Sequence, residues 1–115
     1  MDESRDAAAL ADLIEACERI VTYTRGVEEA GFHRNSLLCD AVIRQVSILG
    51  EAVKRLSAGL RSRHPDVPWQ NIAGMRDRLI HDYDDIDLAE VWRTSRVDVP
   101  ELVQHLREIQ RGLQD

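Results

Sequence analysis

The sequence predicts an all-α protein, an antiparallel up-and-down bundle of four helices whose last helix is kinked or split. Three observations support this fold class. Apolar residues recur every three or four positions in four separate stretches, the period of a helix buried along one side. Turn-forming residues near positions 31, 64–68 and 82–87 separate the stretches by short connections. Short connections place consecutive helices antiparallel to one another.

The first predicted helix begins at about Ser4 or Asp6 and extends to Glu29. Ser4 is suited to cap its start, and Gly31 is placed to end it. Gly26 lies within its last turns, where glycine costs about 1 kcal/mol relative to alanine. The buried stripe consists of Leu10, Leu13, Cys17, Ile20 or Val21, Thr24 and Val27.

The second predicted helix begins at a cap on Asn35 or Ser36 and extends to about Arg61. Gly50 lies within it, and the absence of a side chain there allows another backbone to approach closely. The stripe consists of Leu38, Val42, Gln45, Leu49, Val53, Leu56 and Leu60.

Glu51 follows Gly50 on the same helix. Its ordinary interpretation is a solvated carboxylate or an ion pair with Lys54 or Arg55, which lie three and four residues further on. Nothing in its spacing requires a chemical role, so we prefer that interpretation.

The third predicted helix begins at Trp69, after two prolines that interrupt helical structure, and ends near Asp82. Gly74 weakens it locally. A capping box, Asp87 with Glu90, starts the fourth helix. Pro100 must kink or restart that helix, and residues 98–101 offer a second cap there.

Composition limits the classes of protein. The 115 residues suit a single domain, 1–115. A net charge of −6 argues against a broad basic surface for nucleic acid, although several cations crowd residues 54–78. No apolar run reaches the roughly 20 residues of a membrane span, and the N-terminus lacks a signal-peptide pattern, so we expect a cytoplasmic protein without a membrane partner.

The two cysteines, Cys17 and Cys39, lie on apolar faces of different predicted helices. Buried free thiols are the expected state, and a disulfide is the weaker alternative. Neither the cysteines, the aspartates at 82–87 nor His105 has the spacing of a metal site, so we expect no metal and no cofactor.

Arg76, Asp77, His81 and Tyr83 concentrate reactive side chains within eight residues. On a helix, Asp77 and His81 at i,i+4 share one face, whereas Arg76 and His81 diverge by roughly 140°. Two copies around a two-fold axis would bring the arginine of one toward the histidine of the other, so we interpret the segment as half of a composite site. The ordinary alternative is a solvated helix face with ion pairs.

The spacing of Arg76, His81 and Tyr83 resembles the Arg-X4-His-X-Tyr motif of the HEPN superfamily, in particular the HepT-like ribonuclease toxins. Segments 41–45, 48–56, 65–69, 72–76, 91–92 and 98–100 extend the resemblance over nearly the whole chain. The resemblance implies a HEPN-type bundle and a metal-independent endoribonuclease that acts on single-stranded RNA.

The residue types suit this chemistry, in which the ribose 2′-hydroxyl attacks the adjacent phosphate. His81 can exchange protons near neutral pH. Arg76 can place two donors on phosphate oxygens. Asp77 can support the imidazole by orienting it and favouring its charged form.

The resemblance also implies a toxin–antitoxin pair. In it, a cognate minimal nucleotidyltransferase antitoxin attaches AMP to Tyr83 and silences a homodimeric toxin, which can belong to a larger hetero-oligomer. One alternative is a non-catalytic HEPN module that docks the nucleotidyltransferase or a nucleotide. Another is a structural adaptor, which predicts that the motif face is buried or paired off.

Overall fold

A computed structural model describes residues 2–82 and 84–114. Met1, Tyr83 and Asp115 lie outside the described residues. In chain order the elements are α1 (Asp2–Thr24), α2 (Glu29–Arg34), α3 (Ser36–Arg55), α4 (Ala58–Arg63), α5 (Trp69–Ala73), α6 (Met75–Leu79), β1 (Ile80–Asp82), β2 (Asp85–Ile86), α7 (Leu88–Arg93), the π-helix η1 (Thr94–Asp98) and α8 (Val99–Gln114).

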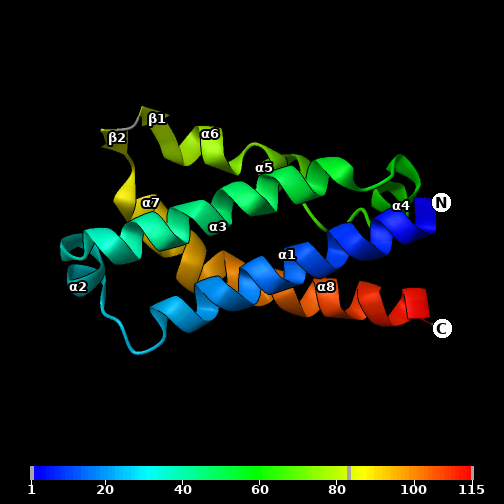
Figure 1. The fold of residues 1–115 in the computed structure, drawn as a ribbon, viewed down its shortest axis with the longest axis horizontal. Helices are drawn as coiled ribbons and strands as arrows, with labels where there is room; N and C mark the ends of the chain where they lie inside the picture. Colours follow the sequence, from blue (N-terminus) through cyan, green and yellow to red (C-terminus); the bar gives the residue numbers. More distant parts are fainter. Residues whose placement is uncertain (1, 83, 115) are drawn as a thin grey trace.

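Four antiparallel legs form the bundle (Figure 1). The legs are α1, α3, the pair α5–α6, and the continuous run α7–η1–α8. Both chain ends lie at one end of the bundle, while α2 and the β1–β2 hairpin lie at the other. The predicted all-α up-and-down bundle with a kinked last helix is therefore confirmed.

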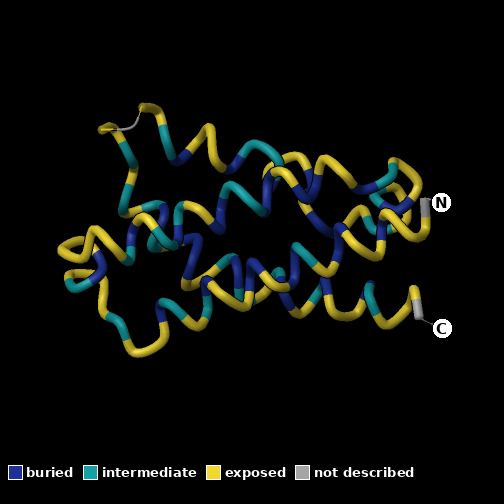
Figure 2. Tube along the Cα trace, in the orientation of Figure 1, coloured by how far each residue is buried: buried dark blue, intermediate teal, exposed yellow. Residues whose placement is uncertain are grey.

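The core lies along the inner sides of the four legs, and the hairpin at the bundle end is largely exposed (Figure 2). α1 packs mainly against α3 and α8, and α3 also contacts α5 and α6. The stripes predicted for the first two helices supply many of the largest fully buried side chains, namely Leu10, Leu13, Ile20, Val42, Leu49, Val53 and Leu60. The last leg adds Val91, Val99 and Leu106, and Phe32 and Val46 are buried outside the predicted stripes.

The first helix ends earlier than its apolar stripe predicts. α1 stops at Thr24, and Gly26 adopts a φ of +72°, the left-handed conformation that ends many helices. The predicted end near Glu29 with Gly31 as its stop is wrong, because Gly31 lies inside α2. Phe32 of α2 is fully buried, and its ring centroid lies 5.2 Å from that of Trp92.

Asn35 caps α3 as predicted, with its side chain accepting a hydrogen bond from Leu38 N at 3.0 Å. The helix nevertheless ends at Arg55 rather than near Arg61. Ser57 starts a separate helix, α4, by accepting from Leu60 N at 3.1 Å. The buried Asp6 carboxylate accepts from Ser57 N at 2.8 Å and from Ser57 Oγ at 2.7 Å. These hydrogen bonds from Ser57 to Asp6 hold the chain at the point where α3 ends and α4 begins.

Asp87 caps the last leg as predicted, accepting from Glu90 N at 3.1 Å. The other half of the predicted capping box is wrong, because Asp87 N donates to Leu79 O and the Glu90 carboxylate pairs with Arg93. The kink at Pro100 takes the form of the π-helix η1, in which Val99 N donates to Thr94 O. A π turn accommodates the missing proline donor and the proline ring while the helix continues. The second cap predicted at residues 98–101 is therefore wrong, and the Asp98 carboxylate instead pairs with Arg93 at 3.2 Å.

Cys17 and Cys39 are both buried and free, as expected. The Cys39 thiol donates to Phe32 O at 3.1 Å, which ties α3 to α2. Within the described residues, no helix combines the length and the apolar content that crossing a bilayer requires.

Candidate functional site

The leg that carries Arg76 and His81 is broken twice. α5 ends at Ala73, Gly74 takes φ −94° and ψ 3°, and α6 ends at Leu79. β1 and β2 then form a short antiparallel hairpin with Ile80 opposite Ile86. A single helix reaching Asp82 is therefore wrong. β-branched Ile80 suits a strand, and Asp87 N donates to Leu79 O at 2.9 Å to close the hairpin.

Gly50 positions this leg against α3. A Cβ atom at Gly50 would lie 3.2 Å from Ala73 O, closer than ordinary van der Waals contact. The close backbone approach expected at Gly50 is thus confirmed. Met75 and Leu79 bury one side of α6 in the core, which turns Arg76 and Asp77 outward.

The motif side chains are exposed in the single chain. The side chains of Arg76 and Asp77 are 56% and 87% exposed, and they form a loose ion pair of 3.7 Å. His81 is exposed on β1, and within the chain no hydrogen bond or ion pair joins it to Arg76 or Asp77. In the single chain the described motif side chains are therefore exposed rather than buried, and Arg76 and Asp77 pair only loosely with each other.

The i,i+4 helical relation expected between Asp77 and His81 does not exist, because α6 ends before His81. Tyr83, the expected site of AMP attachment, lies outside the described residues. Asp84 and Asp85 are exposed beside it. Among the described residues, no three His, Cys, Asp or Glu side chains gather closely enough to hold a metal ion.

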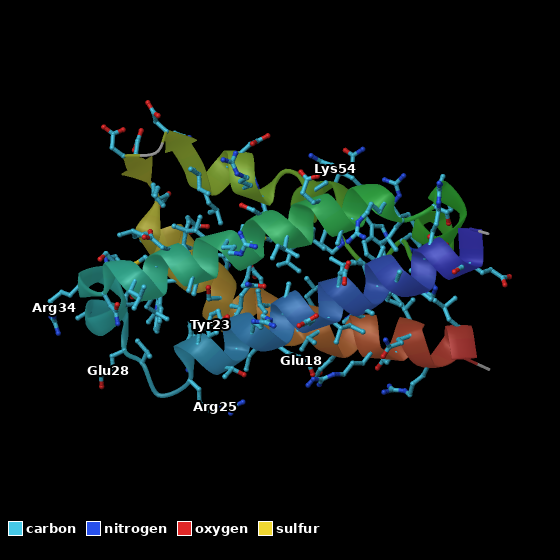
Figure 3. The ribbon with its side chains drawn as sticks, viewed as in Figure 1. Glu18, Tyr23, Arg25, Glu28, Arg34 and Lys54 are labelled. Atoms are coloured by element: carbon cyan, nitrogen blue, oxygen red, sulfur yellow. The ribbon has the colours of Figure 1, made fainter. Side chains whose placement is uncertain are left out.

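Other charged groups near α6 are turned away or paired. The Arg78 guanidinium donates to Asn71 O at 3.0 Å on the other side of α6. Lys54 lies on the side of α3 that faces α5 (Figure 3) and pairs with Glu51 at 3.5 Å. Of the ordinary interpretations of Glu51, the ion pair with Lys54 is the one observed, on a carboxylate that stays largely exposed. Arg76, whose ion pair with Asp77 is long and exposed, is therefore better placed than Arg78 to bind an external phosphate.

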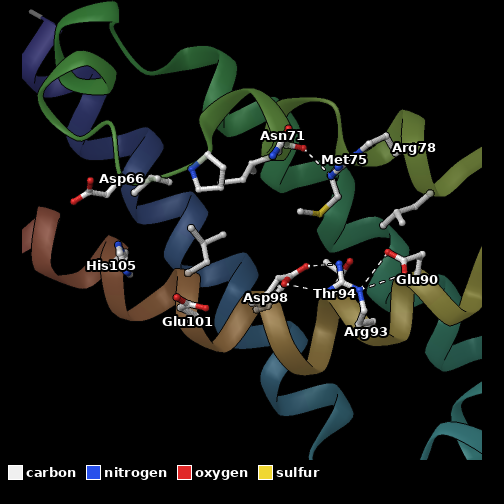
Figure 4. A pocket seen from close by; sticks show the side chains of 16 residues that line it. Asp66, Asn71, Met75, Arg78, Glu90, Arg93, Thr94, Asp98, Glu101 and His105 are labelled. Atoms are coloured by element: carbon white, nitrogen blue, oxygen red, sulfur yellow. Dashed lines mark hydrogen bonds and ion pairs between the residues drawn. The ribbon is translucent and has the colours of Figure 1, made fainter.

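A pocket beside α6 is a separate feature. It measures about 390 Å³ and lies between α5–α6 and α7–η1–α8, with Met75 directed into it (Figure 4). Neither Arg76 nor His81 lines it. Sequence reasoning missed this cavity because its lining residues come from different legs, and no spacing along the chain connects them.

Comparison with known proteins gives one consistent result. The family described as "HepT-like: Ribonuclease HepT-like" matches residues 13–109. "Probable ribonuclease HepT" of Thermococcus cleftensis is 40% identical over 98 residues, covering 81% of this chain and 84% of that protein. "Putative RNase TTE0752" of Caldanaerobacter subterraneus is 37% identical over 100 residues, covering 87% and 89%.

"Putative RNase MJ1216" of Methanocaldococcus jannaschii is 34% identical over 107 residues, covering 93% of this chain and 88% of that protein. No solved structure is significantly similar to this chain.

Proposed function

This chain belongs to the HepT-like ribonuclease family, and from that premise we propose that it is a toxin whose RNA cleavage site is completed by a second copy. The family match makes it an endoribonuclease with RNA as its substrate. One observation supports a site shared between two copies: Arg76 and His81 are both exposed, and no hydrogen bond or ion pair joins them within the described residues of one chain.

The proposed reaction is cleavage by the RNA's own 2′-hydroxyl without a metal ion. His81 on the hairpin exchanges the proton of the attacking hydroxyl or of the leaving oxygen, which requires access to solvent and substrate. Arg76 stabilises the negative charge that develops on the phosphate. Asp77 beside Arg76 supports the site by holding the guanidinium or the partner's imidazole.

The geometry favours a contribution from two chains. Arg76 lies on a five-residue helix anchored by Met75 and Leu79, and His81 lies beyond the end of that helix on the hairpin. Two hairpin ends facing each other across a two-fold axis would place the Arg76 of one chain near the His81 of the other. RNA would then bind between the two copies.

The test compares Arg76→Ala and His81→Ala with the wild type on a fluorescent single-stranded RNA in the presence of a chelator. We expect each variant to lose at least about a hundredfold in cleavage rate at unchanged helical content. Arg78→Ala is the matched control, because Arg78 lies on the same helix but on its other side, and it should cleave normally.

Full cleavage by either motif variant would remove the proposed roles, and loss of cleavage on adding the chelator would contradict metal independence. If the wild type is inactive on RNA but binds a nucleotidyltransferase, the non-catalytic binding module is the correct assignment.

We also propose that a cognate minimal nucleotidyltransferase silences this toxin by attaching AMP to Tyr83. Tyr83 lies two residues after His81, so a nucleotide there would add bulk and negative charge where RNA phosphate is to bind. Incubation with that enzyme and ATP should add the mass of AMP to the wild type but not to Tyr83→Phe. Modification of both proteins would place the acceptor elsewhere.

A further inference from the structure

Two adjoining hollows lie along α8 and together are called the α8 groove; neither Arg76 nor His81 lines them. The cavity of about 390 Å³ is followed by a second hollow of about 410 Å³ toward the end of α8. Asp66, Val67 and His105 line both, so the two hollows adjoin each other. Helix α8 has 16 residues and forms one wall over about 24 Å at 1.5 Å per residue.

Apolar and polar residues together line this α8 groove. Met75 from α6 directs its sulfur into the space facing η1 and α8 (Figure 4), and methionine adapts readily to different apolar partners. At the far end, Leu113 remains 37% exposed. The apolar residues that line the groove are Met75, Leu79, Val99, Leu102, Ile109 and Leu113, of which Leu102 and Leu113 offer the most exposed surface.

The rim of the groove is acidic. Asp66, Glu101 and Glu108 form no ion pair within the described part of the chain, and Glu101 and Glu108 lie two turns apart on one face of α8. Of the three arginines that line the groove, one is paired with carboxylates. Arg93 is held between Glu90 at 3.3 Å and Asp98 at 3.2 Å.

The two remaining arginines do not reverse this balance. Arg78 donates to Asn71 O, a carbonyl that leaves its charge unneutralised, and Arg63 forms no ion pair with a described carboxylate. Three carboxylates without an ion pair therefore face two guanidinium groups without one, so the balance of these charges is weakly acidic. This balance favours a cationic partner over an anionic one.

We propose that the α8 groove docks a helical segment of a partner protein that carries large apolar side chains along one face and lysine or arginine along its flanks. An amphipathic helix of about 15 residues matches the groove in length, and its apolar face fits the apolar residues that line the groove. Its cations complement Asp66, Glu101 and Glu108. The groove thus provides a binding surface that is separate from Arg76 and His81.

The test uses two synthetic 15-residue helical peptides with the same leucine face, one flanked by lysine and the other by glutamate. Binding to the full chain is followed by fluorescence anisotropy, and amide NMR shifts map the contact. We expect the lysine peptide to bind along α8, with affinity that falls as salt rises, and the glutamate peptide to bind at least about tenfold more weakly.

Two double variants with the same change in net charge separate the groove from general electrostatics. Glu101→Gln with Glu108→Gln should weaken the lysine peptide about fivefold. Glu3→Gln with Glu28→Gln removes two exposed carboxylates outside the groove and should leave binding within about twofold. RNA cleavage should be unchanged in both, so this result is independent of the proposed nuclease site.

Three outcomes would overturn the proposal: no binding of the lysine peptide, equal binding of both peptides, or equal weakening by the two double variants. Contact shifts confined to another face of the bundle would overturn it as well.

Discussion

Cys17 shows how strongly the position of one residue controls its chemistry. It is fully buried on the inner side of α1. Burial, with a smaller contribution from nearby Glu18, raises the pKa of the Cys17 thiol to about 12. The thiolate is therefore excluded from the folded protein at neutral pH, and Cys17 is unsuited to act as a nucleophile.

This pKa makes stability depend on alkaline pH. In the unfolded chain the thiol has a pKa of about 8.5. Above that pH, ionisation of the thiol stabilises the unfolded state, whereas the folded state gains the same stabilisation only near pH 12. Between pH 8 and pH 10, Cys17 should lower the free energy of unfolding by about 2 kcal/mol. Denaturant titrations at the two pH values measure this loss.

Cys17→Ala provides the control. The variant is less stable at both pH values because it leaves a cavity, but its loss between them should be smaller than the wild-type loss by the Cys17 contribution. Equal losses in the two proteins would contradict the burial effect.

Several single residues were predictable because their signal is local. Asn35 and Asp87 precede apolar stripes at positions suited to helix caps, and both cap their helices. Asp6 was not recognised as a buried acceptor, because its partner Ser57 is distant in sequence and meets it only in the packed bundle. The position of His81 on an exposed strand was not predicted either, because the sequence pattern placed His81 on a helix.

At the scale of elements, Gly50 determines how closely α5 and α6 approach α3. Gly50→Val would force its side chain against Ala73 O, which a Cβ atom alone already approaches to 3.2 Å. We expect a loss of about 2 kcal/mol in the free energy of unfolding from overpacking. Because α6 follows the displaced segment directly, RNA cleavage should fall as well. Thermal melting and the cleavage assay measure both effects.

Gly112→Val is the matched control. Gly112 also lies within a helix, but no atom lies within 4 Å of a Cβ atom built there. Its stability should stay within about 0.5 kcal/mol of the wild type, since valine and glycine differ little in helix propensity. A similar loss in both variants would show that tight packing is not the cause.

The sequence predicted four legs correctly but misplaced several of their breaks. Helical periodicity continues through Val27 and Leu60, so it cannot detect that the backbone turns at Gly26 and at Ser57. In the third leg, tertiary contacts and the hairpin override a helical pattern that extended to Asp82. Pro100 predicted a kink in the last leg, but it did not predict that the kink would take the form of a π-helix.

At the scale of the whole molecule, the proposed site requires two copies, and mixtures of inactive variants can demonstrate it. Arg76→Ala retains His81, and His81→Ala retains Arg76. In a mixed dimer one composite site loses both residues and the other keeps both. After random exchange of equal amounts, about a quarter of wild-type cleavage should return, because half of the dimers are mixed and each has one working site of two.

A site within one chain would give no recovery, since every protomer lacks one residue. The same preparation should scatter light as a particle of twice 13.1 kDa. A monodisperse protein of 13.1 kDa would exclude the shared site.

The whole-molecule features were the least predictable. The family resemblance and the bundle could be predicted from motif spacing and periodicity. The α8 groove could not, because Asp66, Met75 and His105 belong to different parts of the chain and meet only through packing.

The placement of both chain ends at one end of the bundle, opposite the hairpin, has a practical consequence (Figure 1). A fluorescent reporter or an affinity tag joined to the N-terminal end of α1 would lie at the end of the bundle opposite the hairpin that carries His81. Such a fusion leaves the hairpin open to long transcripts, so the same tagged protein can serve for imaging in living cells and for purification of trapped RNA.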